Sequence, residues 1–198
     1  MRRSPKPAPA AYAAALFFFV GAFAGVLSGC SSKPTFPGDR LPESVQKISK
    51  DVYSIDVQAE LEGKTLGVLW TTESLMDEEG KGVDPEVMDR IGDLTSSVSR
   101  PALSTNRPID FVVVAVRGIR EKSEFQIVRS VDDIRRAYAE ALSIPESMNR
   151  TLQQTKPFDP ESEEAKVFHT GDWTQEDFVA KLILQRVRMA KPLDPDNP

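Results

Sequence analysis

The chain has 198 residues, with 25 basic and 30 acidic side chains, a formal net charge of −5, one histidine and one cysteine. A single cysteine excludes an internal disulfide and a multi-cysteine metal site, and a single histidine excludes a multi-histidine metal site. The acidic balance argues against a nucleic-acid-binding protein. The length allows one ordinary domain and a targeting segment, and we expect no cofactor and no metal.

The first thirty residues have three parts. A short positive start, Met1 to Lys6, precedes eighteen uncharged residues from Ala10 to Leu27, and the segment Leu27-Ser28-Gly29-Cys30 follows. This order is typical of a secretory signal. The alternative is an uncleaved anchor helix, because a membrane span needs roughly 17–25 apolar residues and this uncharged stretch has eighteen.

The segment Leu27-Ser28-Gly29-Cys30 resembles the lipobox of bacterial lipoprotein precursors, in which an aliphatic and two small residues precede an invariant cysteine. The resemblance implies a signal peptide over residues 1–29 and a lipid anchor on Cys30, a diacylglycerol thioether with a further acyl chain such as palmitate. Two or more chains hold a protein stably on a membrane. The resemblance also implies export and, because Ser31 is not aspartate, the periplasmic face of the outer membrane in a Gram-negative cell.

The remaining chain divides into a tether, a domain and a tail. Residues 30–42 contain three prolines around Phe36, which predicts a flexible tether after the lipidated cysteine. Residues 43–191 are expected to form a single α+β domain. Residues 192–198 are expected to form a disordered tail.

The first half of the domain predicts a helix, a hairpin and a second helix. Residues 42–50 are a short helix candidate, and two alternating runs over 55–61 and 66–70 predict a β-hairpin. Asp84 and Pro85 mark the start of a longer helix, which Pro101 is expected to end or kink.

The second half begins with another predicted hairpin. Six consecutive apolar residues over 111–116 indicate a strand buried on both faces, which pairs with a second strand over 124–129. Ser130 and Asp133 then predict the capping box of a helix that buries Tyr138 and Leu142.

Two more helices are predicted before the tail. Ser143 and Glu146 predict a capped short helix that continues to Leu152, and residues 175–190 predict the last helix. The order is therefore ββα-ββα with extra C-terminal helices. This order predicts an α+β fold with a four-stranded, mainly antiparallel sheet, besides the N-terminal signal or anchor helix.

One stretch before the last helix contains the candidate catalytic residues. His169 and Asp172 are close in sequence, so His169 is a candidate general base that Asp172 orients in a hydrolase. The alternative is an ordinary loop histidine, since the chain has no nucleophile-elbow motif.

Charged residues suggest a second kind of site. Arg117, Arg129 and Arg135 belong to a basic group around the second hairpin, and they could hold a small anionic ligand or the carboxylates of a partner if they converge. The alternative is an ordinary charged surface. The acidic residues after Asp159 lack the spacing of a calcium loop and predict a solvated loop.

Together these observations favour a lipid-anchored cell-envelope lipoprotein that acts as a non-enzymatic binding or assembly module for an envelope protein. The alternatives are a hydrolase that uses His169 and Asp172, and a carrier or sensor of a small anionic ligand.

Overall fold

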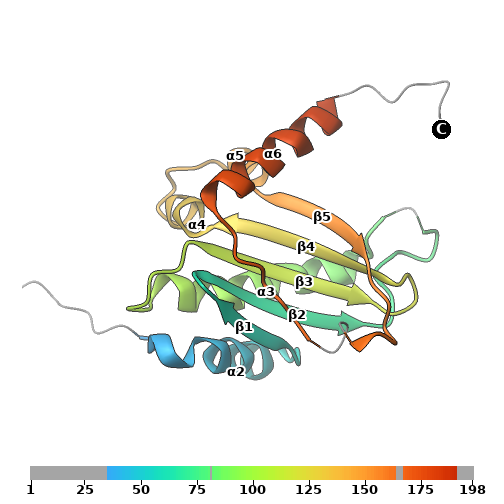
Figure 1. The fold of residues 1–198 in the computed structure, drawn as a ribbon, viewed down its shortest axis with the longest axis horizontal. Coiled ribbons are helices and arrows are strands. Elements are labelled where there is room, and N and C mark those ends of the chain that lie inside the picture. The colour runs from blue at the N-terminus through green and yellow to red at the C-terminus, as the bar shows by residue number, and fades with distance from the viewer. Residues whose placement is uncertain (1–34, 81, 164–166, 191–198) are drawn as a thin grey trace, which may run out of the picture. The chain divides into compact units, whose positions relative to one another are not determined.

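The structure is a computed structural model and describes residues 35–80, 82–163 and 167–190. The predicted signal peptide, Cys30 and the predicted tail lie outside the described residues. The elements in chain order (Figure 1) are a 3-10 turn, η1 (Gly38–Arg40), then α2 (Leu41–Tyr53), β1 (Gln58–Glu62), β2 (Thr65–Thr72), α3 (Pro85–Leu103), β3 (Phe111–Gly118), β4 (Ser123–Ser130), α4 (Val131–Tyr138), α5 (Ile144–Asn149), β5 (Leu152–Pro157) and α6 (Gln175–Ala190).

The strands form one mixed sheet in the order β1-β2-β3-β4-β5. Both predicted hairpins are confirmed, since β1 pairs with β2 and β3 with β4 in antiparallel register. Helix α3 connects β2 to β3, which lie parallel, and β5 adds to the edge of β4 in antiparallel register. The prediction of four strands is wrong, because a fifth strand, β5, begins at Leu152, where the short helix after Ser143 was expected to end.

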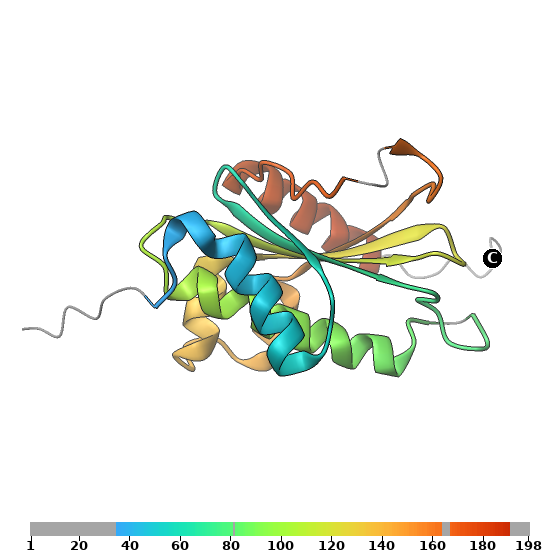
Figure 2. The same ribbon diagram turned by 90° about the horizontal axis from the view of Figure 1, so that it is seen from below.

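Helices α2 and α3 cover one face of the sheet, which we call the α3 face (Figure 2). The apolar side chains of α3 at helical spacing and alternate residues of β2 and β3 fill the main core there, as the periodicity predicts. A hydrogen bond of 2.9 Å between the hydroxyls of Ser49 and Ser97 joins the two helices inside this core.

Helix α6 packs on the opposite face, which we call the α6 face. All eight residues of β3 are buried, so this strand has cover on both sides, as predicted. Phe178 and Leu182 of α6 pack against the side chains of Phe111, Val113, Val128 and Leu152. The rings of Phe111 and Phe178 have centroids 5.3 Å apart.

Several predicted helix details are wrong. Helix α3 ends at Leu103, two residues after Pro101, so the end expected at Pro101 is shifted by two residues. Tyr138 is 63% exposed, because α4 ends there and its last turn leaves the core. Ser130 caps the amide of Asp132 instead of forming a box with Asp133, whereas the box of Ser143 and Glu146 is confirmed.

The folded part begins before residue 43. Phe36 forms a parallel bridge with Thr105, and the amide of Gly38 donates to the side-chain oxygen of Asn106 at 3.1 Å. Leu41 is fully buried, so much of the predicted tether belongs to the fold. None of the helices in the described residues is long and apolar enough to cross a bilayer.

Candidate functional site

The α6 face changes from apolar to polar along β3, β4 and β5. Near α6 it presents the apolar side chains described above, and further along the same strands it presents five polar side chains. We call these five residues the polar cluster: Arg117, Glu124, Gln126, Gln154 and Lys156. Sheet register brings them together, because Glu124 lies directly opposite both Arg117 and Lys156, and Gln126 lies opposite Gln154.

An ion pair occupies the centre of the polar cluster. The Nε of Arg117 lies 2.6 Å from Oε2 of Glu124, and the two side chains are only 9% and 1% exposed. Lys156 contributes a second cation, whose Nζ lies 3.0 Å from Oε1 of the same carboxylate. The buried carboxylate of Glu124 therefore has a cation beside each of its two oxygens.

The two glutamines extend this network along the strands. The side-chain amide of Gln126 donates to Oε1 of Glu124, and Gln154 donates to the side-chain oxygen of Gln126 at 2.6 Å. Because the side chains are linked in one chain of hydrogen bonds, each fixes the orientation of the next. The polar cluster is a preorganised surface.

The electrostatics of Glu124 follow from these contacts. Burial opposes ionisation of the carboxyl group and acts to raise its pKa. The hydrogen bonds and charges of Arg117 and Lys156 outweigh this effect, so the pKa of Glu124 lies below its usual value. The carboxylate stays charged at neutral pH.

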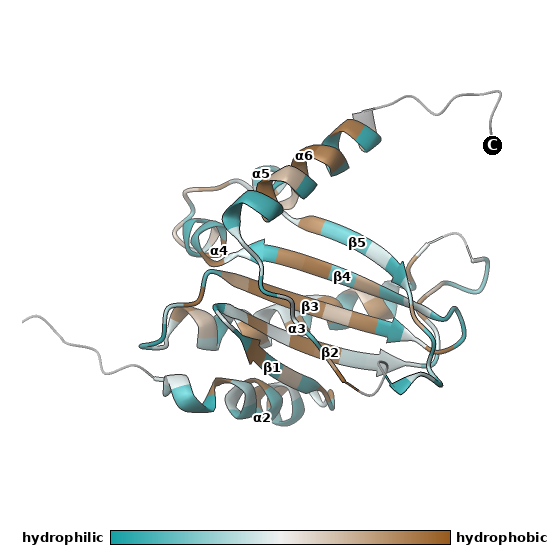
Figure 3. Ribbon diagram, viewed as in Figure 1, coloured by the Kyte–Doolittle hydropathy of each residue, from teal (hydrophilic) through white to brown (hydrophobic). Residues whose placement is uncertain are grey.

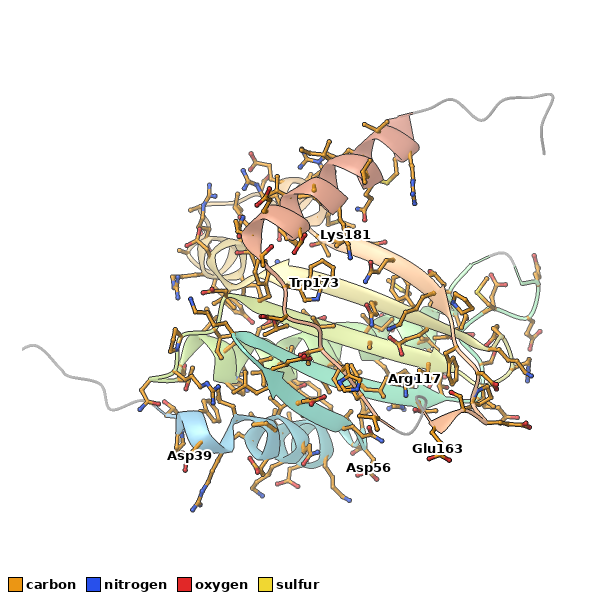
Figure 4. All side chains as sticks on the ribbon, viewed as in Figure 1. Asp39, Asp56, Arg117, Glu163, Trp173 and Lys181 are labelled. Carbon is orange, nitrogen blue, oxygen red and sulfur yellow. The ribbon has the colours of Figure 1, made fainter. Side chains whose placement is uncertain are left out.

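Three members of the polar cluster line an open cleft of about 780 Å³, which we call the polar cleft. Its floor is Arg117, Glu124 and Lys156, and its walls are formed by the chain after β5 and the chain before α6. The guanidinium of Arg117 lies 5.4 Å from the ring centroid of Phe158 in the first wall. Figure 4 shows Arg117 at the end of the sheet near Glu163, which also lines the cleft.

The second wall is fixed by contacts with β1 and β2. Thr170 and Phe168 pack against the backbone of Gly67, where a Cβ atom would lie only 3.0 Å from the ring of Phe168. The amide of Gly171 donates to the Glu62 carboxylate at 3.1 Å. The absence of a side chain at position 67 thus lets this segment lie directly on the sheet.

The predicted catalytic residues lie at the edge of this region. His169 and Asp172 are both exposed. Both line a second, smaller pocket of about 380 Å³, which lies next to the polar cleft. His169 and Lys156 line both the pocket and the cleft. In the part of the chain that the structure describes, no hydrogen bond joins His169 to Asp172. The hydrolase remains a prediction that the geometry of these two side chains does not strengthen.

The three predicted anion-binding arginines do not converge. Arg117 lines the polar cleft, Arg129 lines a pocket between α3 and α5, and Arg135 lines a third pocket beside the end of α3. Each also has a polar or charged neighbour: Arg117 pairs with Glu124, Arg129 donates to the hydroxyl of Ser147, and Arg135 pairs with Asp132. One small anion would not contact all three.

Sequence reasoning missed Glu124, Lys156 and Phe158 as site residues. The only signal was the alternation along β4, which places Glu124 and Gln126 on the same face of the sheet as the apolar Val128. The described residues hold no group of three or more His, Cys, Asp or Glu side chains placed to bind a metal ion.

Comparisons of the chain with known protein families, with curated proteins and with solved structures found no match. The geometry of the polar cleft and the sequence of the first thirty residues therefore carry the functional argument.

Proposed function

We propose that the chain is a lipid-anchored envelope lipoprotein whose domain is a non-enzymatic binding module for a protein partner. The membrane part of the proposal rests on the lipobox resemblance of residues 27–30, with Cys30 as the acylated residue. The binding part rests on the polar cleft.

The observation that carries the binding part is the burial of the Arg117–Glu124 pair at the floor of an open cleft. A buried ion pair gives little net stability compared with apolar side chains of similar size, because both charges lose water. The neighbouring half of the same face is apolar, so an apolar floor would suit the fold equally well. The charges are therefore best explained by a polar segment of a partner that docks over them.

The exposed cation of the cluster provides the test. Lys156 is about half exposed and pairs with Glu124, whereas Lys47 of α2 is more exposed and pairs with Asp51 in the same helix. We would purify the full chain and its Lys156→Gln and Lys47→Gln variants from native membranes after crosslinking, and identify partners by mass spectrometry. The proposal predicts one stoichiometric partner. The amount of partner recovered should fall at least several-fold with Lys156→Gln and stay unchanged with Lys47→Gln.

Two results would overturn this proposal. The first is a partner that both variants retain equally, which would place its binding site away from the polar cleft. The second is the lack of any stoichiometric partner from membranes in which the unaltered chain is present and folded.

A further inference from the structure

The side of α6 that faces away from the sheet is unusually apolar. Phe178 and Leu182 form its buried stripe, yet five more large apolar side chains of this helix are 42–66% exposed. Figure 3 shows apolar residues on α6 beyond the edge of the sheet. The five exposed residues are Val179, Ile183, Leu184, Val187 and Met189.

Helical spacing places four of these residues on one surface. Val179, Ile183 and Val187 follow one another at intervals of four, and Leu184 lies three residues before Val187, at the side of this row. This surface is opposite the buried stripe of Phe178 and Leu182. We call these four residues the outer face of α6.

Basic side chains border the outer face. On a helical projection Arg186 lies at one edge of it, and Lys181 and Arg188 lie at the other. Both acidic residues of α6, Glu176 and Asp177, belong to its first turn. The last three turns are therefore apolar in the middle and positive at both edges.

The contacts of these basic residues hold two of them at the edges. Arg186 donates to the carbonyl oxygen of Asn149 at 3.0 Å, and the Nζ of Lys181 lies 4.4 Å from the ring centroid of Trp173 (Figure 4). An apolar stripe with basic residues on both sides is the pattern of a helix that lies in the plane of an anionic membrane surface.

We propose that the outer face of α6 docks on an anionic lipid bilayer, with its apolar side chains at the acyl boundary and its basic side chains among the headgroups. Charge favours this occupant over a second copy of the chain, because pairing two outer faces would bring like charges together. The proposal concerns a different surface from the polar cleft and does not depend on the lipid at Cys30.

Depth-dependent fluorescence quenching tests the proposal on the full chain. The chain carrying Ile183→Cys, labelled with an environment-sensitive fluorophore, would be reconstituted into phosphatidylcholine vesicles with or without phosphatidylglycerol, some of whose lipids carry an acyl-chain nitroxide. The matched control is Val52→Cys on α2, another apolar residue that is 59% exposed. We expect several-fold stronger quenching at position 183 than at position 52, dependent on phosphatidylglycerol and reduced by Arg188→Gln.

Three results would overturn the proposal: equal quenching at the two positions, quenching at 183 that does not depend on the anionic lipid, or fluorescence at 183 that changes only with protein density. The last result would indicate self-association. Mass spectrometry of the unlabelled chain reports the acyl chains on Cys30 separately, so failure of the anchor and failure of the α6 contact are distinguishable.

Discussion

At the scale of single residues, Glu124 is the side chain on which the site depends most. Its carboxylate is 1% exposed and contacts two cations and one side-chain amide. Removing one member of a buried ion pair leaves the other as an uncompensated buried charge, which costs more than the pair itself contributes.

We therefore expect Glu124→Ala to lower the free energy of unfolding by about 3–5 kcal/mol, because it removes the carboxylate that neutralises the buried Arg117 guanidinium. Urea denaturation would measure this loss. Glu86→Ala is the control, since Glu86 is mostly exposed and lies 3.6 Å from Arg90 on the surface of α3. A loss for Glu124→Ala no larger than that of the control would show that the pair does not hold its cluster together.

The pKa of Glu124 predicts a pH dependence of stability. Burial acts to raise this pKa, but Arg117 and Lys156 lower it below the unfolded value of about 4.3. The carboxylate therefore stabilises the fold above that pH, and the stabilisation is lost as the pH falls through the folded pKa. In urea titrations from pH 7 to pH 3, the stability difference between the native chain and Glu124→Gln should shrink toward acid pH.

Glu121 provides an internal reference for this titration. Burial opposes its ionisation, but hydrogen bonds from the Ser74 hydroxyl and from the amides of Leu75 and Met76 lower its pKa. This acid sensitivity is present in both chains, so their difference reports Glu124. A difference that stays constant down to pH 3 would contradict the assigned role of Glu124.

At the scale of elements, the segment over residues 167–173 forms one wall of the site without being a helix or a strand. Its position depends on side chains that pack against the bare backbone of Gly67 and on the indole of Trp173, whose Nε1 donates to the carbonyl of Thr170 at 3.1 Å. The wall is therefore held by packing against the sheet and by hydrogen bonds within the segment itself.

Gly67→Ala should displace this wall. The added methyl group overlaps Thr170 and approaches the ring of Phe168. Overpacking of this kind typically costs about 1–3 kcal/mol, and here we expect faster proteolysis between β5 and α6 as well. Urea denaturation and limited proteolysis would measure the two effects, with Gly92→Ala as the control, because a Cβ at position 92 meets open space. Equal proteolysis of both variants would contradict the proposed packing.

Strand β5 illustrates why one element escaped prediction. Of its six residues only Leu152 is buried, and the rest are polar or proline. Such a run has no alternating apolar signal, because its place at the edge of the sheet exposes one side. Residues 152–157 are a strand because they pair with β4, a contact that the local sequence does not reveal. The same pairing brings Lys156 opposite Glu124.

At the scale of the whole molecule, the lipobox resemblance predicts how the protein is held. Cys30→Ala should abolish lipidation, so the chain would keep its uncleaved N-terminus and lose the mass of the acyl chains. Mass spectrometry of the protein from membranes would measure both changes. Because the apolar segment before Cys30 is retained, membrane fractionation alone does not suffice. An unchanged mass would refute the lipid anchor.

The two proposed surfaces of the domain differ in the kind of ligand that each binds. Under the two proposals, the fixed charges of the polar cleft bind a protein partner, and the apolar side chains and basic edges of the outer face of α6 bind lipid. Each proposal has its own variant and its own readout, so either can fail alone.

The sequence by itself determined the local features of this protein. Periodicity and capping residues predicted both hairpins, the long helix α3, the box at Ser143 and the span of α6, because these depend on neighbours within a few residues. The predicted anchor at Cys30 is equally local, although it lies outside the described residues.

The tertiary structure alone decided the site. The sequence singled out His169 and Asp172 as neighbours, but the side chains that form the floor of the cleft come from three different strands. Which residues face one another across a sheet depends on register and strand order, and these arise from packing of the whole core. For the same physical reason, the sequence predicted a helix over residues 175–190 but not which of its apolar side chains would remain exposed.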